Sequence, residues 1–599
     1  MEYRVDVRDL KFQLFDWLPL ADLLRAERFA GWDRDNVEMA VDEAVKIARE
    51  ELAPTNEDGD RAGVVFEDGR LRVPASFKPA YRTLREGGWI SCANNPELGG
   101  LGLPETVATA VSELIAGANL SLSLVVLLTR GTAHLVESFG SGELRDLVCR
   151  RMYSGEWAGT MCLTEPQAGS DLGACATTAQ PLGEGRYRIR GEKIFITYGD
   201  HDLTDNVIHA VLARTPEAPA GTRGLSLFVV PKLRLLPGGG LGEANHVECG
   251  GVEHKLGIHG SPTCSLLFGA RGESEGFLLG EEGDGMRQMF QMMNAARIEV
   301  GVQATAVAGA AQQAALAYAR ERRQMRHWDR GRASAAQVPI LEHPDVRRTL
   351  LTSAAYVQAM RALLLRTSYY VDRSRLAEGE ERDRWQALVE LLTPVCKAWP
   401  SDWGFRVAEW SLQVFGGYGY VRDYPAEQYL RDAKITSIYE GTNGIQALDF
   451  VGRKLPARGG APARELLEAA AATAEELAGD AELGGAAQLL GQAVANLEGV
   501  LREVPLRSDA PLLLALNAVP LLDMFGTTLG GHFLLEQARL ARRKLGELGG
   551  QDPAENAEAA FLHDKVQAAV CFAHRALPLV GAQAVALREG EKASMDAVF

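Results

Sequence analysis

The stretch from Arg431 to Gln446 reads RDAKITSIYEGTNGIQ and places a carboxylate, Glu440, directly before a glycine, Gly441. A carboxylate here can act as a positioned base, and a glycine lets another molecule approach the backbone closely. Far upstream, the stretch from Met161 to Asp171 reads MCLTEPQAGSD. Each stretch alone is weak evidence, but their occurrence together in this order is informative.

The length and cysteine content predict a large intracellular protein. At 599 residues the chain is too long for one ordinary core, so several domains are expected. No two of its 8 cysteines have the close spacing of a zinc or redox dithiol site, which predicts free thiols in a reducing compartment. The first twenty residues interleave charged and apolar positions and contain no secretory h-region, so we expect a cytoplasmic protein.

The charge balance disfavours whole classes of partner. Lys and Arg total 63 against 79 Asp and Glu, a net charge of −16, which argues against non-specific binding to nucleic acid or anionic membrane. The most apolar stretch, Pro511 to Leu535, is interrupted by Asn517, Pro520, Asp523 and His532. We therefore expect no membrane span there, but a pair of buried helices.

The hydrophobic pattern changes its period twice along the chain. Helical spacing dominates from about Asn36 to Trp157, and short β-branched runs with glycine and proline between them follow from Arg186. Helical spacing returns at Gly285 and continues through several long segments. The glycine- and proline-rich segment from Pro456 to Pro462 is a predicted linker to further helices.

The two stretches above together resemble the signatures of the flavin-dependent acyl-CoA dehydrogenases, and the helical, β, helical order agrees with that fold. The resemblance covers roughly residues 36–455. Four further features are together similar to a bacterial subgroup of large members that includes the 3-methylmercaptopropionyl-CoA dehydrogenases. They are the segment from Tyr3 to Asp35, Gly191 to Thr197 (GEKIFIT), Val252 to Thr263 (VEHKLGIHGSPT) and the long C-terminal tail.

The resemblance implies a multidomain α+β fold with an N-terminal helical domain, a middle β-barrel-like domain, a C-terminal helical bundle and extra C-terminal helices. The expected division is an N-terminal extension over 1–35, the helical domain over 36–158, the β domain over 159–280, the bundle over 281–455 and a helical extension over 463–599.

By this resemblance, Glu440 is the base that removes the α-proton of an acyl-CoA thioester while the β-hydrogen leaves as hydride to FAD N5. Such a proton is weakly acidic, so the site must raise the pKa of the base and stabilise the enolate oxygen. Some relatives place the base just before an arginine of the first long helix after the β domain. Here that pair is Ala296-Arg297, and alanine accepts no proton. We give the nearby Glu299 a structural role.

The same resemblance implies the FAD-binding residues. They are Leu163, Thr164, Ser170, Phe195 and Thr197 in the β-domain motifs, and Arg322, Gln324, Gln413, Gly416, Gly417 and Thr442 for the adenine and pyrophosphate half, partly across a subunit boundary. For Thr164 and Ser170 the alternative is ordinary turn or cap chemistry. Met325 replaces a frequent aromatic and Gly444 a frequent glutamine, two departures from the family pattern.

Ser170, Arg297 and Gly441 are the implied substrate contacts. For Arg297 a surface-exposed arginine is an alternative of equal weight. We expect structural roles for His254 and His259, and no metal, because the family chemistry requires neither.

The resulting prediction is an FAD-dependent acyl-CoA dehydrogenase that forms a trans-2-enoyl-CoA and passes electrons to electron-transfer flavoprotein. The substrate would be a fatty acyl-CoA or one similar to 3-methylthiopropanoyl-CoA, with chain length left open. Alternatives are an acyl-CoA or nitroalkane oxidase of the same fold, or a nucleic-acid-binding relative that does not dehydrogenate. The extension is expected to pack on the bundle, cover the surface used for tetramer assembly and leave a homodimer.

Overall fold

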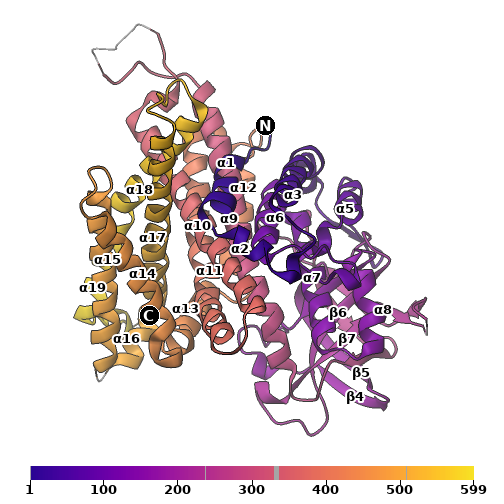
Figure 1. Ribbon diagram of the computed structural model, residues 1–599. Coiled ribbons are helices and arrows are strands. Elements are labelled where there is room, and N and C mark those ends of the chain that lie inside the picture. The colour runs from indigo at the N-terminus through magenta and orange to yellow at the C-terminus, as the bar shows by residue number, and fades with distance from the viewer. Residues whose placement is uncertain (1, 237, 330–335, 508, 599) are drawn as a thin grey trace. The chain divides into compact units, whose positions relative to one another are not determined.

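The computed structural model describes residues 2–236, 238–329, 336–507 and 509–598 (Figure 1). The chain forms two compact units. The helical unit comprises Met1–Ala30, Glu105–Glu113 and Val300–Phe599, and the mixed unit comprises Gly31–Pro104 and Leu114–Glu299. Met1 and Phe599, the outer ends of the two predicted extensions, lie outside the described residues.

The mixed unit begins with helices and ends with strands. Its helices are α3 (Arg34–Ile47), η3 (Ala48–Leu52), α4 (Ala53–Ala62), α5 (Phe77–Glu86), η4 (Trp89–Ser91), η5 (Pro96–Leu98), α7 (Leu120–Phe139), α8 (Gly142–Tyr153), η6 (Leu172–Ala174) and η7 (Thr222–Gly224). Its strands are β1 (Val65–Glu67), β2 (Arg70–Arg72), β3 (Trp157–Cys162), β4 (Thr178–Gly183), β5 (Arg186–Thr197), β6 (Asn206–Arg214), β7 (Leu225–Pro231), β8 (Leu233–Leu235), β9 (Leu241–Ala244), β10 (Val247–Val252), β11 (Thr263–Phe268) and β12 (Ser274–Leu278). Helices α6 (Glu105–Ala118) and α9 (Gly285–Glu321) contribute residues to both units.

The main sheet of the mixed unit closes on itself. Strand β4 pairs with both β5 and β6, so the path β5, β12, β7, β6, β4 returns to its start. Strand β3 lies parallel to β6 on one side, and β11 and β10 extend the other side from β5. Strands β6 and β7 are buried along almost their whole length, as strands covered on both faces are. The middle domain is therefore β-barrel-like, as predicted.

The helical unit holds the bundle and both extensions. Its elements are α1 (Val7–Lys11), η1 (Phe12–Trp17), α2 (Leu20–Leu24), η2 (Glu27–Phe29), η9 (Ile340–Glu342), α10 (Pro344–Leu376), α11 (Gly379–Phe415), η10 (Gly416–Tyr420), α12 (Ala426–Lys434), η11 (Ile435–Ser437), α13 (Asn443–Asp449), η12 (Phe450–Lys454), η13 (Ala457–Gly460), α14 (Ala461–Leu477), α15 (Gly484–Glu503), η14 (Val504–Leu506), α16 (Ala510–Leu516), α17 (Ala518–Glu547), α18 (Ala557–Arg575), α19 (Leu577–Glu589) and α20 (Ala593–Asp596).

The C-terminal extension packs on the bundle, as predicted. Helix α17 contacts α10, α11 and α13, and α18 contacts α10 (Figure 1). The predicted pair of helices is present as α16 and α17, separated at Asn517, but only α17 is largely buried, because α16 buries only Ala510 and Leu513. The predicted linker is not a free loop: η13 turns at Arg458, Gly459 and Gly460, which all have positive φ, and α14 starts at once with a proline in its first turn.

The N-terminal extension joins the C-terminal extension through buried charges, which the sequence analysis did not predict. Asp9 on α1 is fully buried; its Oδ1 accepts from Lys565 Nζ of α18 at 2.7 Å, and its Oδ2 accepts from Arg361 of α10. Arg361 Nε also donates to Glu113 at 3.0 Å. Because each charge has partners of opposite sign, removing one would leave the others buried and uncompensated.

Among the residues that the structure describes, three helical stretches are long and apolar enough to cross a membrane by length and composition alone. They are Leu120–Phe139, Ala518–Glu547 and Ala557–Glu589. On these criteria the prediction that the apolar stretch around α17 falls short was wrong, because its polar interruptions still leave a window with a mean hydropathy of 1.2. The windows of the three stretches are 72%, 83% and 39% buried inside the fold, respectively.

Candidate functional site

The residue predicted to be the base, Glu440, lies in the helical unit on a short loop between η11 and α13. It is half-buried and has a φ of 58°, in the left-handed region that residues other than glycine seldom adopt. Gly441 follows with a φ of 84°. A conformation of this kind costs on the order of 1–3 kcal/mol and persists only when the surroundings enforce it.

Neutral groups hold the backbone of this loop. Gln446 Nε2 donates to the carbonyl oxygens of Glu440 at 3.1 Å and of Gly441 at 3.5 Å. A Cβ at Gly441 would lie 2.7 Å from the same Nε2, so this contact requires glycine. The Tyr439 hydroxyl donates to Gln303 of α9, and Thr442 Oγ1 accepts from the Ile445 N–H at 3.4 Å as the N-cap of α13.

Asn443 fastens the start of α13 to α11. Its Oδ1 accepts from Lys397 Nζ at 2.7 Å and from Ser401 Oγ at 3.2 Å. Its Nδ2 donates to Asp402 Oδ1 at 2.7 Å and to the Ala398 carbonyl at 3.3 Å. Buried polar groups that are satisfied in this way fix one conformation. No local motif in the sequence marked Asn443, Gln446 or Gln303 as positioning residues.

A pocket of about 680 Å³ in the helical unit brings together five of the residues predicted to bind the flavin. They are Arg322, Gln324, Gln413, Gly416 and Gly417. The other lining residues are Tyr318, Met325, Ile340, His343, Val346, Val414, Phe415, Tyr418, Val421 and Asp423. The volume is within the range of small-molecule and cofactor sites.

The pocket has the chemistry that a dinucleotide needs. The Arg322 guanidinium lies 5.5 Å from the centre of the Tyr418 ring, and both side chains line the pocket. The pocket is therefore lined by a positive charge. Gln324 is held by Gln337 Nε2, which donates to its Oε1 at 3.1 Å. A Cβ on Gly416 or Gly417 would meet nothing within 4 Å, so the space that side chains would fill is open to a ligand. The residues present therefore fit the adenine and pyrophosphate half of a flavin.

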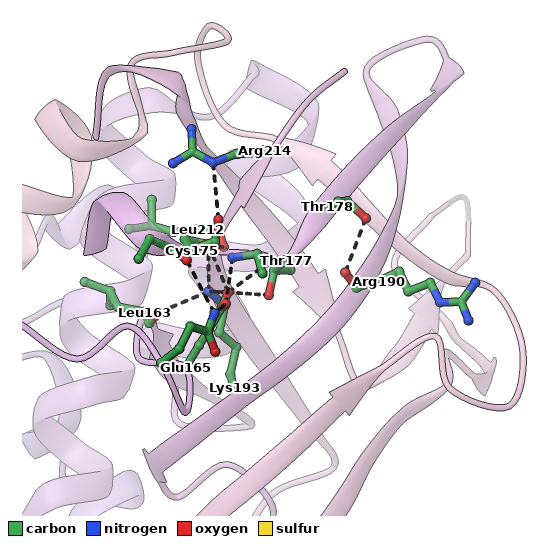
Figure 2. Close-up of polar contacts among 12 residues, drawn as sticks. Leu163, Glu165, Cys175, Thr177, Thr178, Arg190, Lys193, Leu212 and Arg214 are labelled. Atoms are coloured by element: carbon green, nitrogen blue, oxygen red, sulfur yellow. Dashed lines mark hydrogen bonds and ion pairs between the residues drawn. The ribbon is translucent and has the colours of Figure 1, made fainter. Parts of the chain in front are cut away.

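In the mixed unit, a buried ion pair fixes the loop that follows β3. Lys193 Nζ on β5 donates to Glu165 Oε1 at 2.8 Å and to the Leu163 carbonyl at 3.0 Å (Figure 2). Glu165 also accepts from the N–H and hydroxyl of Thr177, the Ala176 N–H and the Cys175 thiol. Burial alone would raise the pKa of Glu165, but Lys193 and these donors outweigh burial and hold the pKa well below its usual range. The sequence did not predict this set of contacts around Glu165, because Lys193 lies 28 residues away from it along the chain.

The predicted flavin contacts of this unit lie along the clamped loop and the end of β5. Leu163 is buried, Thr164 is half-buried and Ser170 is exposed. The Thr164 carbonyl accepts from the Ile194 N–H at 2.9 Å, which ties the loop to β5. Thr197 is half-buried and pairs with Thr263 of β11.

Phe195 is presented by a bulge in β5. The register with β11 shifts between Cys264 and Leu266, and Phe195 has a φ of 57° with 59% of its surface exposed. A β-bulge redirects a side chain, and an aromatic residue with positive φ is a strained exception. The exposed Phe195 ring is thus held at the cost of backbone strain. An exposed ring of this kind could stack against a planar aromatic ligand such as an isoalloxazine.

Arg297 is buried, with 5% of its surface exposed, which excludes the alternative of a surface arginine. Its Nη1 donates to Asn294 Oδ1 at 3.2 Å. Glu299 forms an ion pair with Arg130 at 3.0 Å, in keeping with a structural role. The contacts of His259 are also those of a structural residue: its Nδ1 lies 2.9 Å from Asp60 Oδ1, and its Nε2 hydrogen-bonds the Lys255 carbonyl.

Models of four protein domains match the chain in order. Residues 34–156 match the acyl-CoA dehydrogenase N-terminal domain, residues 160–270 the middle domain and residues 283–455 the C-terminal domain. Residues 466–597 match a model described as acetyl-CoA dehydrogenase C-terminal like.

Curated relatives are similar over almost the whole chain. The 3-methylmercaptopropionyl-CoA dehydrogenase of Ruegeria pomeroyi is 38% identical over 582 residues, 96% of each chain. A butyryl-CoA dehydrogenase of Syntrophomonas wolfei is 35% identical over 99% of this chain and 98% of its own. The broad-specificity linear acyl-CoA dehydrogenase FadE5 of Mycobacterium tuberculosis is 35% identical over 96% of each.

Solved structures share the fold. An acyl-CoA dehydrogenase complexed with FAD from Bacillus anthracis has a TM-score of 0.74 at 22% identity and covers 98% of this chain and 93% of its own. From the domain models and the identities to curated relatives, the chain belongs to the acyl-CoA dehydrogenase family of FAD-dependent oxidoreductases.

Proposed function

We propose that the protein converts an acyl-CoA thioester into a trans-2-enoyl-CoA, with Glu440 as the base that removes the α-proton. The observation that carries this proposal is the strained loop of Glu440. Glu440 has a backbone φ of 58°, and its backbone carbonyl accepts a hydrogen bond from Gln446. The residue is therefore held in one strained conformation at an energetic cost. Such a cost is expected where a catalytic group is preorganised.

The chain's own groups divide the work. Glu440 would accept the α-proton, and backbone N–H groups of its loop would donate to the thioester oxygen as it becomes an enolate. Arg297 and Ser170 would orient the acyl-CoA together with the backbone at Gly441. No histidine or metal is required for these steps.

The residues that would hold FAD are those predicted from the sequence. Leu163, Thr164, Ser170, Phe195 and Thr197 belong to the mixed unit, and Arg322, Gln324, Gln413, Gly416, Gly417 and Thr442 to the helical unit. When bound, FAD supplies the acceptor for the β-hydrogen, which leaves as hydride. Around it, Arg322 would neutralise pyrophosphate charge, and the open glycines of η10 would allow close backbone approach.

We propose an unbranched acyl chain, either fatty or similar to 3-methylthiopropanoyl, because the named relatives act on butyryl, linear acyl and 3-methylmercaptopropionyl thioesters. Electron-transfer flavoprotein is the proposed acceptor, the cytoplasm the proposed compartment and a homodimer the proposed assembly. The five-domain division also stays a proposal. Light scattering of the intact protein tests the assembly, and a tetramer mass would exclude it.

The test of the reaction is anaerobic addition of butyryl-CoA, 3-methylmercaptopropionyl-CoA and longer linear acyl-CoAs to the holoenzyme. Bleaching of the flavin absorbance identifies the substrates, and product analysis must find the trans-2-enoyl thioester. Oxygen uptake with peroxide formation during aerobic turnover would instead favour an oxidase. No bleaching by any acyl-CoA, with salt-dependent retention on DNA, would favour the nucleic-acid-binding relative, which the net charge of −16 disfavours.

A further inference from the structure

The residues of helix α11 that form hydrogen bonds with Asn443 lie in the same two turns that contact the C-terminal extension. Lys397, Ala398, Ser401 and Asp402 bind Asn443. The indoles interleaved with them face α17. Trp399 Nε1 donates to Thr527 Oγ1 at 3.1 Å, and Trp403 Nε1 donates to Asp523 Oδ1 at 2.7 Å. A shift of these indoles would therefore move the groups that hold the loop of Glu440.

Helix α17 also contacts the helix that begins beside the base. Phe525 packs on Phe450, directly after α13, with ring centroids 5.3 Å apart and both side chains fully buried. Close-packed side chains of this kind transmit small displacements, because the interior has no free space to absorb them. The loop of Glu440 is thus bordered by two elements, α11 and α13, that both rest on α17.

Gly526 shows how tightly α17 fits. A Cβ built there would lie 2.4 Å from Trp399 Cγ and 2.6 Å from Cδ1, closer than any van der Waals contact. Gly491 on α15 is a natural comparison, since a Cβ there would meet only Ala474 Cβ, at 3.7 Å. Both glycines are inside long helices, so alanine raises the intrinsic helix propensity equally at the two positions.

We propose that the C-terminal extension is part of the catalytic apparatus, with Gly526 and Thr527 on α17 acting as positioning residues that set Glu440 through Trp399 and Asn443. The inference rests on the proposed role of Glu440 as the base. It gives the extension a function in the reaction in addition to covering the bundle.

The experiment compares Gly526→Ala with Gly491→Ala in the full-length holoenzyme. Amide hydrogen exchange, followed by mass spectrometry of peptides covering 438–446, reports on the loop without any substrate. Anaerobic flavin reduction at saturating butyryl-CoA or 3-methylmercaptopropionyl-CoA reports on the reaction. In Gly526→Ala we expect faster exchange in this loop and reduction slowed about 10- to 100-fold, with little change in KM, because a displacement near 1 Å has effects of this size. Gly491→Ala should behave as the wild type in both.

Wild-type loop exchange or wild-type reduction in Gly526→Ala would overturn the inference. If that variant does not fold, Thr527→Val removes the acceptor of the Trp399 indole without adding volume, and the same two readouts apply. The proposed role of Glu440 is judged separately: normal reduction by Glu440→Gln refutes the base whatever the glycine variants do.

Discussion

Glu165 and Glu440 are glutamates of two sequence motifs, and the structure treats them in opposite ways. Glu165 is held through its carboxylate by Lys193 and several further donors, which keep it ionised. The backbone of Glu440 is held by the neutral amide of Gln446, and Asn443 joins the start of α13, which follows the loop, to α11. A fixed ammonium group lowers the proton affinity of a carboxylate, so the pairing with Lys193 marks Glu165 as a structural carboxylate. The proposed role of Glu440 instead rests on the strained backbone conformation of its loop.

The largest effect is expected at the reactive glutamate. Glu440→Gln keeps the shape but removes the proton acceptor, so acyl-CoA and FAD should still bind while flavin reduction falls about 10²- to 10⁴-fold. Stopped-flow absorbance under anaerobic conditions measures this. The control is Glu427→Gln, which changes a glutamate of the same unit that forms an ion pair with Arg431 on α12, and this variant should reduce the flavin normally.

Glu165→Gln should damage the fold rather than the chemistry. Lys193 would remain fully buried without its carboxylate, and breaking a buried pair from one side costs about 3–5 kcal/mol of unfolding free energy. Urea denaturation measures the loss. Adding Lys193→Met removes the unpaired buried charge. The double variant should therefore lose less unfolding free energy than the two single variants lose together. A single-variant loss as small as that of the exposed pair Arg25–Asp22 would contradict this account.

A third carboxylate, Asp372, extends the comparison because its contribution to the unfolding free energy should depend on pH in the opposite direction to that of Glu165. Asp372 accepts from the N–H groups of Glu105 and Thr106 at the start of α6, and burial raises its pKa to about 6. A raised folded-state pKa contributes stability that is complete below the unfolded value near 4 and is lost as the pH rises through 6. Glu165 has the opposite sign, with its contribution present above about pH 4 and lost only at lower pH.

From pH 4 to 7, the unfolding free energy of the wild type should therefore fall relative to Asp372→Asn, by about 2–3 kcal/mol. Urea unfolding of both proteins at several pH values gives the difference. A difference that does not vary with pH would show that Asp372 does not titrate in this range.

The smallest effect is expected at the polar contacts proposed for the flavin. Replacing Ser170 and Thr197 with alanine together should weaken FAD binding by about 1 kcal/mol per lost hydrogen bond and shift the flavin spectrum. Equilibrium dialysis and the absorbance spectrum test this. Ser154→Ala is the matched control, since that hydroxyl donates to the Arg151 carbonyl and accepts from the Glu156 N–H within the turn that follows α8. Unchanged occupancy and spectrum in the double variant would exclude direct contact.

The sequence predicted the order of the domains and the motif residues because both depend on local patterns. Periodicity separated helical from β regions, and the resemblance selected Arg322, Gln324, Gln413, Gly416 and Gly417, which line one pocket. Contacts between distant residues leave no local pattern. Nothing in the neighbourhood of Glu165 points to Lys193, and nothing in the apolar faces of the extension shows that α17 contacts α11 and α13, the two helices that border the loop of Glu440. The strain at Phe195 and Glu440 was likewise unpredictable, because their φ angles are imposed by tertiary contacts.

The buried cluster around Asp9 has a consequence for biosynthesis. Asp9 is translated well before its partners Arg361 and Lys565, which follow 352 and 556 residues later. At about 5–20 residues per second, Lys565 is translated roughly 30 to 110 seconds after Asp9. During that interval α1 has an apolar face and a carboxylate without its full set of native partners. Ribosome-bound chains that stop before α18 should therefore be the species that chaperones hold, and α1 becomes protected from proteases only after α18 has been translated.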